Sequence, residues 1–161
     1  MYKTRILVDI SDAAVSNQPG DVLTTYSLGS CIGVALYDQT AKIGGLLHYQ
    51  LPESKIDPEK AKTVPFMFAD TGMALLIDKL VSMGATKKRL NVRIAGGASM
   101  STGPKGFDIG KRNYLAIRKI LWKHGLFIDA EDIGGSSPRN MYLNVEDGSL
   151  TIRCVGVEKK L

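Results

Sequence analysis

One cysteine and one histidine in this sequence could react as a pair. Cys31 follows Gly29 and Ser30, and His48 comes shortly after it along the chain. A free cysteine has a pKa of about 8.5, so at neutral pH it becomes a nucleophile only when a base removes its proton. A neighbouring imidazole supplies that base. The residue types therefore predict nucleophilic attack on a carbonyl carbon.

A β-hairpin is expected to bring the two side chains together. Residues 32–37 and 43–51 alternate between the two faces of a strand. A two-residue turn at Gln39-Thr40 would set Cys31 directly opposite His48, where Cβ atoms lie about 4.5 to 5.5 Å apart. The other face of both strands is apolar and is expected to face the core. A turn one residue longer would separate the pair, so this prediction depends on the register.

Small residues and hydroxyl groups near the thiol could assist its reaction. Gly29 and Ser30 leave little bulk beside Cys31, and backbone N–H groups there could bind an oxyanion. The preceding strand offers Thr24, Thr25 and Ser27 as partners for the second imidazole nitrogen. The residues alone favour none of these three hydroxyls.

Structural interpretations compete with the chemical one. Cys31 could be a buried core thiol and His48 a hydrogen-bonded strand histidine. Cys154 looks more structural, because a tight turn at Asp147-Gly148 would place it opposite Met141 in the core. The hairpin alone is therefore suggestive of a site without establishing one.

Metal and cofactor signatures are missing from the sequence. The two histidines are far apart and there is no Cys-x-x-Cys pair. Gly96-Gly97 and Gly134-Gly135 match neither a P-loop nor a dinucleotide-binding motif. We expect no metal and no cofactor.

The order of predicted elements indicates an α+β fold. Strands are predicted at residues 5–9, 22–28, 32–37, 43–51, 90–95, 126–129, 140–145 and 150–155, and helices at 66–83 and 111–124. Strands come first and last with helices between, which favours a layered sandwich with mixed β-sheets and two main helices over a doubly wound sheet. We expect one domain over residues 1–161, with loops at 52–65 and 132–138.

Composition places the chain among ordinary folded proteins of the cytoplasm. Hydrophobic residues make up 44% and charged residues 23%, and neither a signal-peptide core nor a membrane-spanning segment is present. The net charge of +5 comes from short clusters and is typical of solvated surface, with steering toward an acidic partner as a second interpretation. Nucleic-acid binding would depend on the isoelectric point alone, so we do not expect it.

Several motifs recur in the order of a known family. The segment Leu28-Gly-Ser-Cys31 is followed by His48 within residues 44–52. Three later motifs are Gly96-Gly97-Ala98 with Met100, residues 109–113 ending in Asn113, and residues 132–135 with Arg139. Together, over roughly residues 20–155, they resemble the CheD family of chemoreceptor glutamine deamidases.

This resemblance implies a fold, a reaction and site residues. The fold would be a three-layer sandwich of helices on mixed β-sheets. Cys31 would be the nucleophile, His48 its base, and Thr25 the third catalytic residue. The activity would be that of a hydrolase acting on the carboxamide of protein glutamine, a protein-glutamine glutaminase that forms a Cys31 thioester, releases ammonia and leaves glutamate. Hydrolysis of glutamate methyl esters would follow from the same intermediate.

The resemblance also implies partners. Methyl-accepting chemoreceptors would be the protein substrates, in a role in chemotaxis adaptation, and a CheC-type phosphatase would be a second partner. No nucleic acid and no membrane insertion are expected. The alternative is a non-enzymatic regulatory binding partner of such a phosphatase or of receptors, which would bind without turnover.

Overall fold

The computed structural model describes residues 3–99 and 108–161 of the chain. One five-stranded sheet, called here the outer sheet, contains in spatial order β1 (Thr4–Leu7), β3 (Asp21–Leu28), β8 (Arg139–Asn144), β9 (Leu150–Cys154) and β10 (Val157–Lys160). The central sheet contains β2 (Asp12–Ser16), β5 (Ile43–Tyr49), β4 (Ile32–Asp38), β6 (Leu90–Gly96) and β7 (Ala130–Ile133). The helices are α1 (Pro58–Thr63), α2 (Ala69–Ser82) and α3 (Ile109–Lys123), and the 3₁₀ turns are η1 (Ser54–Ile56), η2 (Pro65–Met67) and η3 (Lys87–Arg89).

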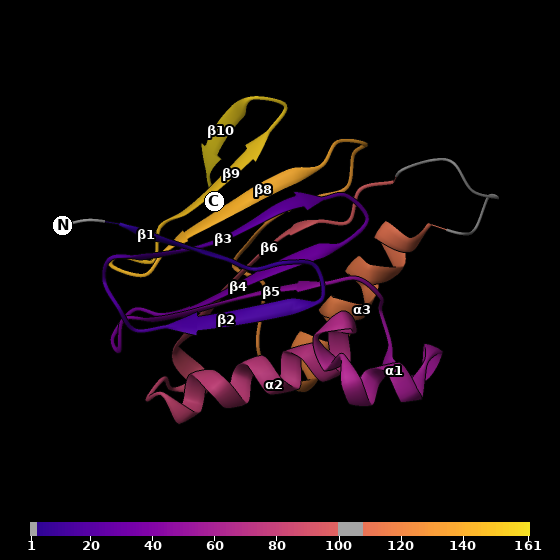
Figure 1. Cartoon of the computed structure of the whole chain (residues 1–161), viewed down its shortest axis with the longest axis horizontal. Helices are drawn as coiled ribbons and strands as arrows, with labels where there is room; N and C mark the ends of the chain where they lie inside the picture. Colours follow the sequence, from indigo (N-terminus) through magenta and orange to yellow (C-terminus); the bar gives the residue numbers. More distant parts are fainter. Residues whose placement is uncertain (1–2, 100–107) are drawn as a thin grey trace.

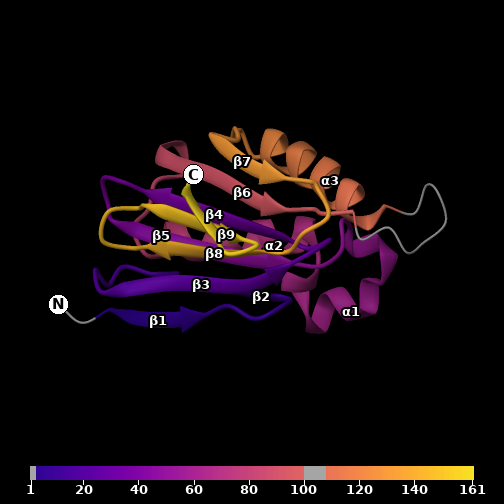
Figure 2. The ribbon, with the colours of Figure 1, turned by 90° about the horizontal axis from the view of Figure 1, so that it is seen from above.

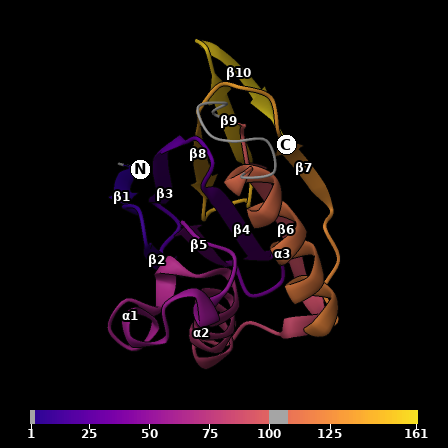
Figure 3. The same ribbon diagram turned by 90° about the vertical axis from the view of Figure 1, so that its right-hand side faces the viewer.

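These elements form three layers. The outer sheet lies on one face of the central sheet, and the helices lie on the other face (Figure 1). Seen from the side, α1 and α3 stand on opposite sides of α2 (Figure 3). Both sheets mix parallel and antiparallel pairs. The structure confirms the predicted α+β layered sandwich. No helix within the described ranges is long and apolar enough to cross a membrane.

Strand β4 is buried on both faces and divides the core into two clusters. Ile32, Val34 and Leu36 belong to the cluster that packs against α2 and α3. Ala35 belongs to the second cluster, which fills the space between the two sheets and also contains Cys31. The site residues of the hairpin therefore lie between sheets, on the face away from the helices.

The register predicted for the β4–β5 hairpin is wrong by two residues. His48 lies opposite Gly33, and Ile32 opposite Tyr49, so Cys31 lies just beyond the last pair of the ladder. Side chains alternate with a period of two along a strand, so an error of two residues leaves each on its predicted face. Cys31 and His48 still share one face, as diagonal neighbours and not as a directly opposed pair.

A four-residue turn over residues 39–42 causes this shift. Asp38 Oδ1 accepts hydrogen bonds from the N–H groups of Thr40 and Ala41, each at 3.0 Å. Lys42 then adopts a left-handed conformation with φ of 58°. Arg89 holds the same carboxylate through an ion pair of 3.0 Å. The turn is thus stabilised by a side chain that a two-residue turn would not use.

Cys154 is also misplaced by the sequence prediction. Met141 lies opposite Ile152, and Cys154 lies opposite Val157 at the end of β9. Its side chain is only partly buried. The expected core position for this thiol is therefore wrong, again by two residues of register.

Four elements differ from the sequence prediction. Strand β7 comes after the predicted segment 126–129, which is irregular. The predicted loop at 52–65 contains α1, which begins with Asp57 accepting the N–H of Lys60. Strands β2 and β10 were not predicted, because β2 has few strong strand-forming residues and β10 is exposed along its length. The motif residue Met100 lies outside the described residues.

Helix α3 begins against the turn that ends β6. A Cβ atom added to Gly110 would overlap the carbonyl oxygen of Ala98 and lie 2.7 Å from that of Gly97. These obstacles are backbone atoms, which cannot move aside as a flexible side chain can. Glycine at this position therefore allows α3 to approach the segment that contacts Cys31.

We expect Gly110→Ala to destabilise the protein. In an ordinary helix the change would stabilise by about 0.5–1 kcal/mol, but here overlap with backbone should cost about 1–3 kcal/mol. Denaturant unfolding of both proteins measures the difference. Gly72→Ala in α2 is the matched control, because its nearest neighbours are Leu47 methyl groups at 3.2 Å, which can shift. A Gly110→Ala protein as stable as the parent would contradict this packing argument.

Candidate active site

His48 is held in one tautomer by a hydroxyl from the other sheet. Thr25 Oγ1 lies 2.7 Å from His48 Nδ1 and 2.6 Å from the carbonyl oxygen of Val8. A carbonyl oxygen only accepts, so the single hydroxyl hydrogen of Thr25 goes to Val8. Thr25 must then accept the hydrogen of Nδ1, which leaves the lone pair on Nε2. This is the tautomer in which Nε2 can act as a base.

The lone-pair nitrogen of His48 is buried and unpaired. Nε2 has no hydrogen-bond partner among the described residues, although only 3% of the residue is exposed. The backbone of His48 is fixed on both sides, by β2 through Asp12 and by β4 through Gly33. A buried acceptor without a partner costs free energy, and such groups occur where a reacting proton will be received.

Of the three hydroxyls offered by the sequence, Thr25 is the one that reaches the imidazole. Thr24 Oγ1 donates instead to the carbonyl oxygen of Val22 at 3.2 Å. Ser27 is exposed and has φ of 60°, within a β-bulge between Thr25 and Leu28 where β3 carries one extra residue. The bulge ends the regular pairing of β3 directly after Thr25.

The segment before β4 is held by three contacts to its carbonyl groups. Gly29 O accepts the N–H of Ala98 at 2.8 Å, and Cys31 O accepts the N–H of Gly97 at 2.9 Å. Ser30 O accepts Asn113 Nδ2 at 2.9 Å. The thiol is therefore positioned from the end of β6 and from α3, which explains why the motifs at 96–98 and 109–113 accompany it.

Asn113 is a site residue to which the sequence prediction gave no role. Its fully buried amide also donates to Gln50 O at 2.9 Å, so one side chain links the residues next to Cys31 and His48. Its backbone carbonyl accepts the hydroxyl of Tyr49 at 2.6 Å. A polar residue on the buried stripe of α3 was the available signal, since the other large residues of that stripe are Ile117 and Leu121.

The same contacts determine where the N–H groups of this segment point. Carbonyl and N–H groups of a trans peptide point in opposite directions. The N–H groups of Ser30 and Cys31 therefore point away from Ala98 and Asn113. The N–H of Ser30 donates to no described residue, and the N–H of Cys31 faces its own thiol sulfur. The N–H of Gly29 is already used, since it donates to Ser27 O at 3.0 Å. Of the two residues expected to bind an oxyanion, Ser30 thus has its N–H available.

Burial keeps the thiol and the imidazole neutral. Burial raises the pKa of Cys31 to about 11, although its own N–H group opposes the shift. Burial lowers the pKa of His48 to about 4, with a smaller opposite effect of Asp9. In the described part of the chain no hydrogen bond joins the two side chains. As diagonal neighbours on adjacent strands, their Cβ atoms are separated by roughly 7 Å.

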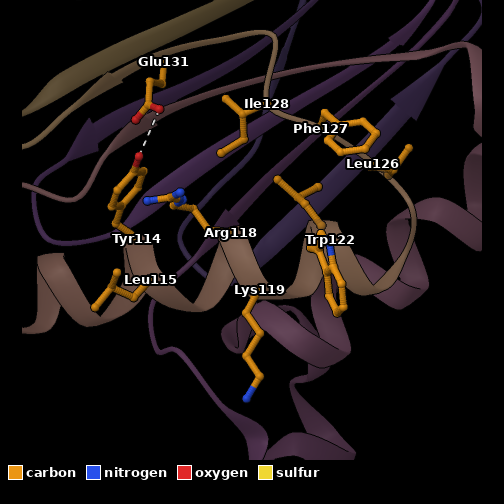
Figure 4. Close-up of a pocket in the computed structure, with 10 residues that line it drawn as sticks. Tyr114, Leu115, Arg118, Lys119, Trp122, Leu126, Phe127, Ile128 and Glu131 are labelled. Carbon is orange, nitrogen blue, oxygen red and sulfur yellow. Dashed lines mark hydrogen bonds between the residues drawn. The ribbon is translucent and has the colours of Figure 1, made fainter.

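A hollow on the surface of the described part of the chain lies at a different place. It lies outside α3, is lined by residues 114–131, and contains neither cysteine nor histidine among its lining residues (Figure 4). His124 ends α3, and its Nδ1 lies 3.4 Å from Lys87 Nζ. The thiol–imidazole pair between the sheets is therefore the site with the means for covalent chemistry.

Comparison with known proteins gives one consistent result. The sequence model of a family described as CheD chemotactic sensory transduction matches residues 50–154. A Solibacter usitatus protein named probable chemoreceptor glutamine deamidase CheD is 48% identical over 157 residues, 98% of this chain and 93% of that protein. One from Syntrophus aciditrophicus, named probable chemoreceptor glutamine deamidase CheD 1, is 48% identical over 94% of both chains. One from Clostridium botulinum, carrying the same name without a number, is 44% identical over 98% and 97%. This chain belongs to the CheD family.

Proposed function

We propose that this protein deamidates glutamine side chains of chemoreceptors, with Cys31 as nucleophile, His48 as base and Thr25 as the residue that orients the base. The observation that carries the proposal is the buried, unpaired Nε2 of His48, whose tautomer is set by Thr25 on the same side of the sheet as the thiol. The names of the relatives supply the substrate, a chemoreceptor glutamine.

The reaction begins from a neutral pair. Because burial favours the uncharged forms of both groups, the Cys31 proton moves to His48 Nε2 as the sulfur attacks the carboxamide carbon. This requires the two side chains to approach from their resting positions, a change that substrate binding commonly brings about. The imidazolium then returns the proton to the departing nitrogen, and ammonia leaves.

The N–H groups of Ser30 and Cys31 bind the oxygen that becomes negative during attack. Neither donates to another described residue, and the N–H of Cys31, which faces its own sulfur at rest, is freed as that sulfur bonds to the substrate carbon. Both belong to the segment held by Ala98 and Asn113. Donors held in place before the reaction stabilise the oxyanion without reorganisation, and one such donor contributes about 2.7–4 kcal/mol in a well-studied hydrolase. Asn113 thus positions the donors and does not itself touch the substrate.

Water completes the cycle. His48 Nε2 removes a proton from a water molecule, which attacks the γ-glutamyl thioester and releases glutamate and the Cys31 thiol. A glutamate methyl ester yields the same thioester with methanol as the leaving group, so esterase activity follows from the same site. A purely regulatory role for the protein would require none of these groups.

Removal of either reacting group is expected to abolish ammonia release. Cys31→Ala and His48→Ala should each reduce kcat for a purified chemoreceptor fragment by roughly 10³-fold or more, because they remove the nucleophile or its base. Mass spectrometry of the fragment measures the gain of glutamate. Cys154→Ala is the matched control and should retain full activity, since this thiol lies at the end of β9. Parental turnover in the Cys31 variant would refute the mechanism and favour a binding role.

Thr25 is expected to act through the tautomer of His48. Thr25→Val keeps the shape of the side chain but removes the acceptor for Nδ1–H, so kcat should fall roughly tenfold to a hundredfold with KM unchanged. Thr25→Ser restores the hydroxyl and should restore most of the rate. Steady-state kinetics on a glutamine peptide separates the two constants. Equal kcat for the valine and serine variants would show that the hydroxyl is not needed.

The pH dependence of the rate should reveal the lowered pKa of His48. A base works only when unprotonated, so a pKa lowered from 6.5 to about 4 keeps His48 competent through weakly acidic conditions. We expect kcat/KM to stay level as pH falls through 6.5 and to decline only toward about 4. Circular dichroism at each pH monitors folding, because charging a buried histidine also destabilises the native state. A decline centred near 6.5 would contradict the structure.

A further inference from the structure

The excess positive charge of the chain is concentrated on α3. This helix carries Lys111, Arg112, Arg118, Lys119 and Lys123 and no carboxylate. The chain has 21 Lys and Arg against 16 Asp and Glu, so the rest of the molecule is neutral on balance. All five cations are exposed, and none forms an ion pair within the described ranges. The charge of α3 thus equals the net charge of the whole chain.

The same helix borders a hollow of about 680 Å³, whose lining combines apolar side chains with Arg118, Lys119 and Glu131. Leu115 and Trp122 stand on its outer face, two turns apart, and Phe127 stands on the segment that follows α3 (Figure 4). Their exposures are 51%, 73% and 74%, which is unusual for side chains of this size. Leu126 and Ile128 line the hollow between them.

Two acidic residues near α3, Glu131 and Asp70, form hydrogen bonds but no ion pair with the helix. Glu131 accepts the hydroxyl of Tyr114 at 2.9 Å, and Arg118 lies over that ring at 5.7 Å from its centre. On the other side of the helix, Asp70 accepts two hydrogen bonds from Ser54. The cations of α3 therefore stand beside exposed apolar side chains without an ion-pair partner among the described residues.

We propose that the outer face of α3, together with Phe127, binds an acidic amphipathic helix of another protein. An apolar ridge on the partner would occupy the hollow between Trp122 and Phe127. Glutamate or aspartate residues flanking that ridge would pair with Arg118 and Lys119. Charge complementarity of this kind determines orientation and speeds association.

Other occupants fit this surface less well. A second copy of the chain would bring one basic helix against another, and the longest alternative helix, α2, has both acidic and basic residues on it. An anionic membrane would suit a convex apolar surface, whereas here the aromatic side chains border a depression whose lining includes Glu131 (Figure 4). A narrow acidic helix matches both the shape and the charge.

Trp122 provides a direct test, because it is the only tryptophan of the chain. The probe is a synthetic stapled helix with leucines along one face and glutamates on both flanks, titrated into the purified full chain. We expect a saturable blue shift of tryptophan fluorescence that weakens with added salt. A matched peptide with lysine in place of glutamate should bind at least about tenfold more weakly.

Variants separate the charged half of the surface from the apolar half. Arg118→Glu combined with Lys119→Glu should weaken binding of the glutamate peptide by at least about tenfold. Lys60→Glu with Lys62→Glu on α1 changes the net charge equally, far from α3 (Figure 3), and should have no effect. Phe127→Ser should weaken binding without altering its dependence on salt. This last variant keeps the test valid should the charge reversal disturb folding.

Three outcomes would overturn the proposal. These are the absence of a saturable shift with the glutamate peptide, equal binding of both peptides, and a shift produced by phosphatidylserine vesicles in preference to the peptide. Deamidation of a short glutamine peptide should be unchanged in the α3 variants. The result at this surface is therefore independent of whether the proposed catalysis is correct.

Discussion

The hydrogen bond between Thr25 and His48 joins two sheets, and the site depends on it. Thr25 belongs to β3 of the outer sheet and His48 to β5 of the central sheet (Figure 2). Packed sheets lie about 10 Å apart. A side chain from one sheet can therefore contact one from the other only where the spacing between the sheets matches the combined length of both side chains. Gly33 permits this closeness, because a Cβ there would overlap Met141. The tautomer of the imidazole is thereby a consequence of tertiary packing and not of the hairpin alone.

The same interior that aligns these groups also suppresses their charges. A thiol whose pKa is raised to about 11 and an imidazole whose pKa is lowered to about 4 are inert toward most solutes at neutral pH. Only 8% of Cys31 is exposed. A resting site of this kind is protected from adventitious oxidation and alkylation. In the proposed mechanism, reactivity is confined to a substrate that can enter the space between the sheets and complete the proton transfer.

Sequence periodicity predicted the faces of the hairpin but not its register. Cys31 and His48 share a face as expected, but the strand pairing differs from the prediction by two residues. The cause is Asp38, whose side chain accepts hydrogen bonds from two backbone N–H groups of the turn. Local patterns could not reveal that change, since it depends on a contact with Arg89. Thr25 could not be distinguished from its neighbours by residue type, because its reach to His48 depends on sheet packing. Resemblance to the family singled it out.

The order of these parts along the chain has a consequence for synthesis. Thr25, Cys31 and His48 all lie in the first third of the sequence, whereas the groups that fix the thiol segment come from residues 97, 98 and 113. During synthesis the proposed nucleophile and base therefore emerge from the ribosome long before the residues that hold the thiol segment in place. If these residues act as proposed, the growing chain assembles the complete site only after α3 has emerged.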